Sequence, residues 1–312
     1  MRVLFTGASS FTGFWFVREL ACAGHEVVAT FRRGPDEYAD EPRRTRCARL
    51  VEYCRPVHGC TFGDDLFVNL VRDAGPWDLF CHHAADVTNY KSPDFDVHAA
   101  VANNTRNLDA VLDALRSAGC RRVLLTGSVF EPHEGAGSQD LPAFSPYGLS
   151  KGLTAEIFRY HTAIRDMRLG KFVIPNPFGP YEEPRFTMYL VRHWREGKTP
   201  VVNTPAYVRD NIPVSLLAKA YVRFAQSLGD GPGFQKTNPS GYVESQGAFA
   251  QRFAAEMASR LGIPCPLDLR RQTEFTEPRV RLNTDLLDAA ELGWDESLAW
   301  DELADYYRGL PK

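Results

Sequence analysis

The chain has 312 residues, of which 44% are hydrophobic and 24% charged, with a formal net charge of -3. These values predict a globular protein of one large or two modest domains and argue against disorder. The two signs of charge are interspersed without a basic run, which argues against nucleic acid or an anionic membrane as partner. The first apolar run, residues 3–5, is soon broken by Gly7, so we expect neither a signal peptide nor a spanning helix, and a cytoplasmic protein.

The seven cysteines form an odd set with no CxxC pair. Cys47, Cys54, His58 and Cys60 lie close together in the sequence, but their spacing matches no common zinc pattern. We therefore expect reduced thiols and no metal site.

Strands and helices alternate through the first half of the chain. Hydrophobic periodicity and glycine stops predict strands over residues 3–5, 26–31, 78–82, 122–125 and 171–174, and helices over residues 11–23, 99–118 and 147–167. The polar stretch 32–55 is expected to be loop and a short helix. This alternation predicts an α/β fold, a Rossmann-type doubly wound parallel sheet with helices on both faces.

Beyond Pro175 the pattern changes to short segments punctuated by proline and glycine. Helices are predicted over residues 187–196, 214–227, 245–261 and 295–307. We expect a smaller α/β cap over the carboxyl edge of the sheet, where open α/β sheets bind ligands. The predicted division is 1–175 for the Rossmann domain and 176–312 for the cap, with segments around 206–228 returning to the first domain.

Residues 6–13, Thr-Gly-Ala-Ser-Ser-Phe-Thr-Gly, join the first strand to the first helix. A tight turn there directs backbone N–H groups and a helix N-terminus at a pyrophosphate. The spacing fits TGxxGxxG, except that Ser10 stands where a glycine lets the backbone approach the phosphates. Serine is small and can donate a hydrogen bond, so we predict a dinucleotide site, the alternative being an ordinary small-residue turn. The expected contacts are Gly7, Ser9, Ser10, Phe11, Thr12 and Gly13.

The end of the second strand bears on which dinucleotide binds. NAD sites usually place Asp or Glu there for the ribose 2′-hydroxyl, whereas Arg32 and Arg33 follow this strand. A guanidinium would pair with a 2′-phosphate, which favours NADP over NAD. The alternative is a pair of solvated loop arginines.

Tyr147 and Lys151 form the only YxxxK pair, at the start of a predicted helix. Their spacing puts the phenol and the ammonium on one helix face. A nearby cation lowers the pKa of a phenol toward working pH, and such a group can move a proton at a hydroxyl or ketone while hydride is transferred. Lys151 can also hold the nicotinamide ribose. A surface Tyr/Lys pair is the alternative.

A hydroxyl at the end of the preceding strand can orient the reacting oxygen. Ser128 is the first candidate, and Thr126 is the alternative because the segment is short. If Tyr147 is not the acid/base, the next candidates are His82, His83 and Glu131.

Five further segments complete the set of motifs. They are Gly63-Asp64, Asp78-Leu79-Phe80-Cys81-His82-His83-Ala84-Ala85, Asn176-Pro177-Phe178-Gly179-Pro180, Arg209-Asp210-Asn211-Ile212-Pro213-Val214, and Glu277-Pro278-Arg279-Val280-Arg281 followed by Leu292-Gly293-Trp294. With the glycine loop and YxxxK, they resemble the extended (atypical) short-chain dehydrogenase/reductases. This is the nucleotide-sugar epimerase/dehydratase/reductase family that includes UDP-galactose 4-epimerase, and the resemblance covers nearly the whole chain.

The resemblance implies roles for further residues. Ala84 and Ala85 would line the cofactor, and Asp64, with Asp65 beside it, would reach the adenine. Pro175 is assigned to the same cofactor site. The implied substrate contacts are Asn176, Arg209, Arg279 and Arg281, with Arg209 at the nucleotide diphosphate. The family also implies a homodimer in which helices 99–118 and 147–167 pair with their copies, although their apolar faces could equally be core.

Three functions follow from these expectations. The chain is an epimerase that retains its cofactor, a ketoreductase that consumes NADPH, or a catalytically degenerate dinucleotide-binding regulator. The Tyr147/Lys151 pair argues against the regulator, and the predicted NADP site favours a reductase. Val129-Phe130 after Ser128 argue against a 4,6-dehydratase, which has Asp-Glu there. The nucleotide, the sugar and the reacting carbon stay open.

Overall fold

The computed structural model describes residues 1–138 and 140–311. Its largest element is a seven-stranded sheet in the order β11-β7-β5-β4-β1-β2-β3, with every neighbouring pair parallel. The strands are β1 (Arg2–Thr6), β2 (Glu26–Phe31), β3 (Arg55–His58), β4 (Leu79–His82), β5 (Arg122–Ser128), β7 (Arg168–Ile174) and β11 (Gly233–Thr237). The order is doubly wound, because successive strands leave β1 in both directions. The predicted Rossmann-type fold is confirmed.

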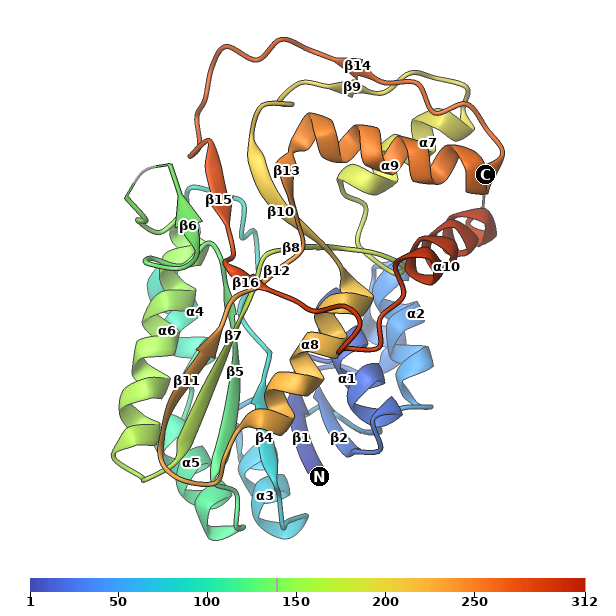
Figure 1. The fold of residues 1–312 in the computed structure, drawn as a ribbon. Helices are drawn as coiled ribbons and strands as arrows, with labels where there is room; N and C mark the ends of the chain where they lie inside the picture. Colours follow the sequence, from blue (N-terminus) through green and yellow to red (C-terminus); the bar gives the residue numbers. More distant parts are fainter. Residues whose placement is uncertain (139, 312) are drawn as a thin grey trace.

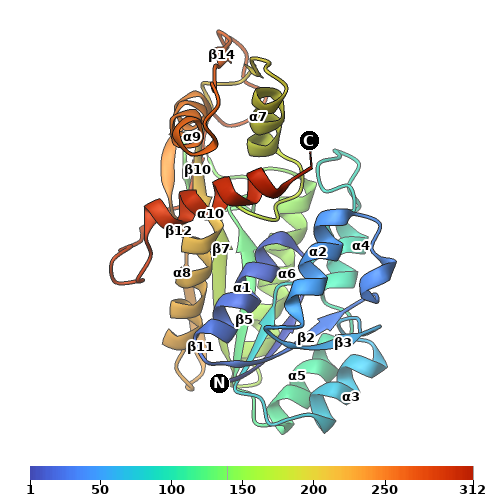
Figure 2. The ribbon, with the colours of Figure 1, turned by 90° about the vertical axis from the view of Figure 1, so that its right-hand side faces the viewer.

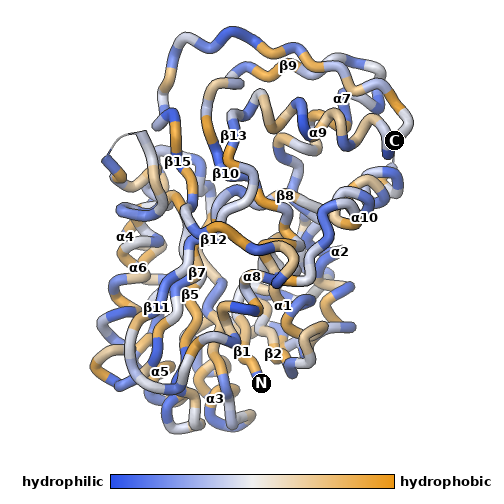
Figure 3. The backbone as a smooth tube through the Cα atoms, in the orientation of Figure 1, coloured by the Kyte–Doolittle hydropathy of each residue, from blue (hydrophilic) through white to orange (hydrophobic). Residues whose placement is uncertain are grey.

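Helices cover both faces of this sheet (Figure 1). One face packs against α1 (Phe11–Cys22), α2 (Glu41–Leu50) and α8 (Val214–Ser227), and the other against α3 (Asp65–Asp73), α5 (Leu108–Ser117) and α6 (Pro146–Ala163). A strand sends alternate side chains to opposite faces, so Val3 and Phe5 enter the first core and Leu4 the second. Figure 3 shows hydrophobic colour concentrated in the central strands, while α5 and α6 are banded.

The prediction of one continuous helix over residues 99–118 is wrong. The structure has α4 (Val97–Asn104) and α5 instead, separated by a turn at Thr105–Asn107. Asn107 has a φ of 52°, a left-handed conformation that asparagine tolerates and that a continuous α-helix does not contain. The apolar spacing continues across this turn, which is why periodicity alone did not reveal it.

The cap is built on a five-stranded sheet formed by β13 (Tyr242–Ser245), β10 (Val208–Pro213), β15 (Val280–Leu282), β6 (Ala136–Gly137) and β8 (Asn176–Phe178). Two small pairs join it: β9 (Val201–Val202) with β14 (Asp268–Leu269), and β12 (Pro239–Ser240) with β16 (Asp285–Leu286). A third core gathers under α7 (Phe186–Arg195), α9 (Gln246–Leu261) and α10 (Glu296–Gly309). The 3-10 turn η1 (Pro35–Glu37) lies in the first domain.

The cap lies over the carboxyl ends of the large sheet, and α10 crosses between the cap helices and the α1/α8 layer (Figures 1 and 2). The two parts are interleaved, because the chain leaves β10, forms α8 and adds β11 at the edge of the large sheet. The ring of Tyr221 on α8 stacks on Phe16 of α1 with centroids 4.0 Å apart. The returning segment therefore comprises α8 and β11.

Candidate active site

The loop after β1 is shaped by two close approaches. Gly7 has a φ of +83°, and a Cβ there would lie 2.7 Å from the backbone nitrogen of Ala84. A Cβ on Gly13 would collide with the carbonyl oxygen of Gly7. Ser10 caps α1, because its Oγ accepts the N–H of Gly13 at 3.1 Å. Only glycine fits at positions 7 and 13, and the result is a backbone cradle at the carboxyl edge of the sheet.

A buried arginine that the sequence did not single out holds this loop from behind. Arg46 of α2 is fully buried and donates to the carbonyl of Ser9 at 3.0 Å. It also donates to the carbonyl of Tyr181 and to the carboxylate of Glu183, at 2.6 and 2.7 Å. Arg46 thus joins the glycine loop to the segment that leads from β8 into the cap. Its place in a polar, arginine-rich stretch gave no sign of burial.

The second strand ends at Phe31, and Arg32 and Arg33 lie exposed directly after it. Asp64 caps α3, and its carboxylate accepts the N–H of Phe67 at 2.7 Å and of Thr61 at 2.8 Å. Asp65, next in the chain, is exposed. These residues gather at the β2 and β3 side of the same sheet edge.

Tyr147 and Lys151 lie in the first turns of α6, whose N-terminus is capped by Ser145. Lys151 is buried, and its Nζ donates to the carbonyl of Thr126 at 2.6 Å. The ring of Tyr147 packs edge-on against Tyr90 and Phe95, with centroids 5.6 and 6.0 Å away. The helix can come this close to the end of β5 because Gly148 faces the carbonyl of Phe130, where a Cβ would collide.

The expectation that Lys151 lowers the pKa of the Tyr147 phenol is not met in this structure. Burial, and then the carboxylate of Glu131, raise the pKa of Tyr147 above its ordinary value. Burial also lowers the pKa of Lys151 to about 8, against the opposing effect of Glu131. The physical reason is that the ammonium is directed at the Thr126 carbonyl, while the negative charge of Glu131 acts on both groups.

The two candidate hydroxyls at the end of β5 differ in their surroundings. The Oγ1 of Thr126 lies 2.9 Å from Nδ1 of His83. The Oγ of Ser128 accepts the N–H of Phe130 at 3.2 Å, which leaves its proton available to another acceptor. The side chain of Thr126 is therefore committed to the protein interior.

Three buried charged residues, Glu131, Lys171 and Glu134, lie directly behind Ser128, and the exposed Lys236 joins them at the surface. Glu131 accepts the N–H of Ser128 at 2.7 Å and pairs with Lys171 at 2.6 Å. Lys171 also pairs with Glu134 at 2.8 Å, and Lys236 reaches Glu134 at 2.9 Å. Each buried charge has an opposite partner, as burial in a protein requires. The signal in the sequence was a lysine inside an apolar strand, Lys171.

The predicted substrate residues have unequal surroundings. Asn176 lies in register with Asn211 across the β8–β10 pair, and its buried Nδ2 has no hydrogen-bond partner within residues 1–138 and 140–311. Arg209 pairs with Glu277 at 2.9 Å and lies over the Tyr207 ring. A buried amide N–H without a partner is costly, and the Nδ2 of Asn211 is in the same condition among the described residues.

Arg279 precedes β15 and Arg281 lies within it, and only Arg279 is accessible. The guanidinium of Arg279 lies over the ring of Phe275, 4.4 Å from its centroid. Arg281 is 1% exposed and donates to the carbonyls of Val129 and Glu131 at 2.8 and 2.6 Å. Arg281 therefore stabilises the loop that follows Ser128, and its charge is not presented to a substrate. The sequence had led us to expect Arg281 among the substrate contacts.

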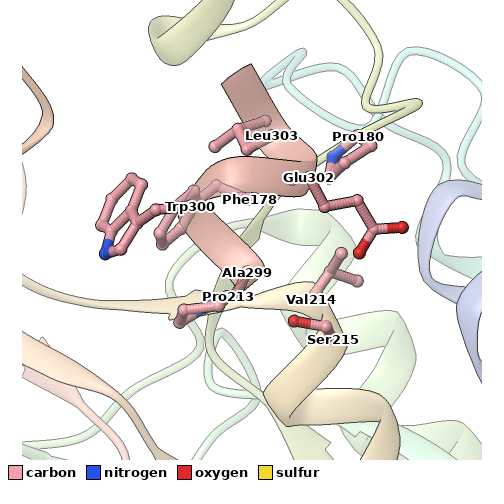
Figure 4. A pocket seen from close by; sticks show the side chains of 10 residues that line it. Phe178, Pro180, Pro213, Val214, Ser215, Ala299, Trp300, Glu302 and Leu303 are labelled. Carbon is pink, nitrogen blue, oxygen red and sulfur yellow. The ribbon is translucent and has the colours of Figure 1, made fainter. Parts of the chain in front are cut away.

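A cavity of about 10 Å³ between α10 and the start of α8 is lined by residues including Pro213, Trp300 and Leu303 (Figure 4), and it is too small for a dinucleotide. No group of three His, Cys, Asp or Glu side chains suited to a metal occurs in the part of the chain that the structure describes, and the cysteines are free. No helix among those same residues is long and apolar enough to cross a membrane.

The sheet order, the glycine cradle at the end of β1 and the tyrosine–lysine helix after β5 define a dinucleotide-binding α/β protein of the oxidoreductase type. The profile of the NAD dependent epimerase/dehydratase family matches residues 3–238. The chain belongs to this family and is an enzyme of the extended short-chain dehydrogenase type.

Known proteins similar to the chain span its whole length. A UDP-glucose 4-epimerase of Mycolicibacterium smegmatis is 26% identical over 97% of this chain and 96% of the relative. The structure of UDP-glucuronic acid 4-epimerase from Bacillus cereus, with UDP-glucuronic acid and NAD, superposes with a TM-score of 0.73 at 17% identity, covering 100% of both chains. A UDP-glucose-4-epimerase from Stenotrophomonas maltophila with NAD gives 0.73 at 21% identity, covering 99% of this chain and 98% of that one. These structures share the fold.

Proposed function

We propose that the chain is a nicotinamide-dependent nucleotide-sugar epimerase or ketoreductase in which Tyr147 is the acid/base. The observation that carries the proposal is the meeting of three parts at one sheet edge: the Gly7–Gly13 cradle, the buried Lys151 and the end of β5. The curated relative, a UDP-glucose 4-epimerase, supports a nucleotide sugar as substrate. A catalytically degenerate regulator is the alternative, and an intact Tyr147/Lys151 pair argues against it.

The residues present fit a nicotinamide dinucleotide. Glycine at positions 7 and 13 lets the loop pack against its own backbone and that of Ala84, and the N–H groups of Phe11 and Thr12 lie in the first turn of α1, where no helix carbonyl precedes them. Gly7, Ser9, Ser10, Phe11, Thr12 and Gly13 would hold the pyrophosphate, Asp64 and Asp65 would lie toward the adenine, and Ala84, Ala85, Lys151 and Pro175 toward the nicotinamide half. When bound, the dinucleotide supplies a hydride acceptor and donor.

The arginines after β2 favour NADP over NAD. Arg32 and Arg33 are exposed at the position where NAD sites usually carry an acid. The epimerase structures named above contain NAD, so this preference would distinguish the chain from those proteins. An NADP preference in turn favours the ketoreductase.

In the proposed mechanism, Tyr147 takes the proton of a sugar hydroxyl while the carbon loses hydride, and returns a proton to the ketone oxygen in the reverse direction. Ser128 donates a hydrogen bond to the same oxygen, and its available proton makes it a better candidate than Thr126. Lys151 would hold the nicotinamide ribose with its ammonium, which the Thr126 carbonyl fixes in place. Asn176, Arg209 and Arg279 would hold the substrate, with Arg209 at the nucleotide diphosphate.

Epimerase and ketoreductase are separated by cofactor stoichiometry. The purified protein is incubated with UDP-glucose, UDP-glucuronic acid or a 4-keto nucleotide sugar, with each of NAD, NADP and NADPH, and the products are separated by chromatography. Epimer formation without net change of cofactor supports the epimerase, and one NADPH oxidised per keto-sugar supports the reductase. Dinucleotide binding without turnover of any of these substrates would favour the regulator.

We also propose that the chain forms a homodimer through α6, in the cytoplasm. Leu149, Leu153, Tyr160 and Ile164 form an exposed stripe along that helix, at helical spacing. The corresponding residues of α5 are different, since Leu108, Val111, Leu112 and Leu115 are buried in the core. The proposed interface is therefore centred on α6 and its copy. The free cysteines are in keeping with a reducing compartment.

A further inference from the structure

We infer that His83 is a positioning residue of the phosphate loop, which holds the hydroxyl of Ser10 against the protein so that a serine can occupy the middle glycine position. The inference deepens the proposed function, because it rests on dinucleotide binding by this loop. It gives a physical account of the one departure from the TGxxGxxG spacing.

The His83 ring lies between the loop and the end of β5. Its Nε2 is 3.0 Å from the Oγ of Ser10 and 3.1 Å from the Oγ1 of Thr12. Its Nδ1 is 2.9 Å from the Oγ1 of Thr126. The ring also packs edge-on against Phe16, with centroids 5.3 Å apart. One side chain thus connects the turn, the first helix and the central strand.

The contacts of the Ser10 hydroxyl use its full hydrogen-bonding capacity. A hydroxyl has one proton and two lone pairs. The Oγ of Ser10 donates to the carbonyl of Gly7 at 2.9 Å and accepts the N–H of Gly13 at 3.1 Å, so the remaining lone pair faces His83. Nε2 of His83 is then the donor, and Nδ1 accepts the proton of Thr126. This arrangement leaves the Ser10 hydroxyl with no capacity directed at the ligand side.

The neutral ring that this arrangement requires fits its surroundings. Burial, and then the ammonium of Lys151, lower the pKa of His83 to about 3, so one nitrogen donates and the other accepts at neutral pH. The loop also lies directly on this segment, since a Cβ on Gly13 would be 3.0 Å from Cδ2 of His83. Without the ring, the Ser10 hydroxyl loses a partner and its other staggered rotamers become accessible. In those rotamers the Ser10 hydroxyl would occupy the space where a phosphate approaches the backbone of the loop.

A double-mutant cycle tests this role. Dissociation constants for NAD and NADP are measured by calorimetry for the wild type, His83→Leu, Ser10→Gly and the double variant. We expect His83→Leu to weaken binding by roughly tenfold with Ser10 present, because the partly buried Ser10 hydroxyl loses its partner. In the Ser10→Gly background the same change should cost less than about twofold, since the hydroxyl to be held is gone. Ser10→Gly alone, whatever its own affinity, is the reference from which the second cost is measured.

A second pair of variants keeps the test decisive if His83→Leu does not fold. Thr126→Val removes the partner of Nδ1 with little change of shape, and should weaken dinucleotide binding several-fold when Ser10 is present and not in the Ser10→Gly background. Thr162→Val is the matched control, because Thr162 is buried in α6 and bonds only to its own helix. Its dissociation constants should equal those of the wild type.

The outcomes separate this inference from the function on which it rests. Equal losses in the wild-type and Ser10→Gly backgrounds would show that His83 is merely part of the packing, and no loss in either would remove its role altogether. Either result overturns the inference while dinucleotide binding stands. Failure of the wild type to bind any nicotinamide dinucleotide would overturn the proposed function and this inference together.

Discussion

Lys151 donates a hydrogen bond from its ammonium to the carbonyl of Thr126 at 2.6 Å, which fastens α6 to the end of β5. Tyr147, one helical turn earlier, is thereby held beside the carboxyl edge of the sheet. The lysine is buried, and the carboxylate of Glu131 acts electrostatically on both residues. The proton chemistry of Tyr147 therefore depends on a bound substrate and cofactor to offset burial, and the following predictions test its parts.

Tyr147→Phe should abolish most activity on the true substrate. The change removes only the hydroxyl, so fold and dinucleotide binding should survive, while the loss of general acid–base catalysis lowers kcat by about 10²–10⁴. Steady-state kinetics and cofactor titration measure the two effects. Tyr160→Phe, on the exposed side of the same helix, is the control and should behave as the wild type. Retention of more than about a tenth of kcat by Tyr147→Phe would remove Tyr147 from this role.

The decrease of kcat/KM at alkaline pH should follow the deprotonation of Lys151. Burial lowers the pKa of this lysine to about 8, so its positive charge is present below that pH and is lost as the pH rises through it. The profile of kcat/KM for the free enzyme should fall above pH 8. Lys151→Arg retains a positive charge, since a guanidinium stays protonated, and should move this limb upward by at least about one pH unit even if the maximal rate is lower. An unchanged limb in Lys151→Arg would assign it to another group.

Arg32→Ala should lower the affinity for NADP much more than the affinity for NAD. Loss of a charged partner for the 2′-phosphate should weaken NADP binding by about tenfold or more and leave NAD binding within about twofold. Paired dissociation constants measure this difference. Arg72→Ala on α3, also an exposed arginine, is the control for net charge. Equal or tighter binding of NAD by the wild type would contradict the NADP preference.

Glu182→Gln should change stability only at neutral and higher pH. Burial raises the pKa of Glu182 to about 7, so the folded chain holds this proton more tightly than the unfolded chain does. Stability associated with this group is thus present at low pH and falls as the pH rises from about 4.5 to about 7. The glutamine variant lacks the buried charge and should be more stable than the wild type at pH 8 by on the order of 2 kcal/mol, and similar at pH 4.5. The midpoints of urea unfolding, measured for both proteins at pH 4.5 and pH 8, test this prediction. An equal stability difference between variant and wild type at the two pH values would contradict it.

Leu153→Glu should dissociate the proposed dimer. The residue lies in the exposed stripe of α6, and a carboxylate there would be desolvated against its copy. Sedimentation should show a dimer for the wild type and a monomer for the variant at micromolar concentration. Leu298→Glu, at a more exposed leucine near the start of α10, is the control and should remain dimeric. A monomeric wild type would refute the interface.

Local pattern alone determined the main elements of this protein. Residues 26–31 and 214–227 were predicted with the bounds that β2 and α8 have, because periodicity and glycine or proline stops act within a few residues. The alternation of such elements also determined the doubly wound sheet. The strand β3 and the break at Asn107 were missed, since Arg55–His58 contains no apolar run and the turn interrupts no apolar spacing.

Tertiary structure decided what the site residues contact. Thr126 and Ser128 are equivalent hydroxyls in the sequence, and the distinction comes from His83, 43 residues away along the chain from Thr126. Arg281 resembled a substrate residue until its guanidinium was located on the carbonyls of Val129 and Glu131. A side chain's type limits the bonds that it can form, but which partners are within reach depends on how distant segments pack.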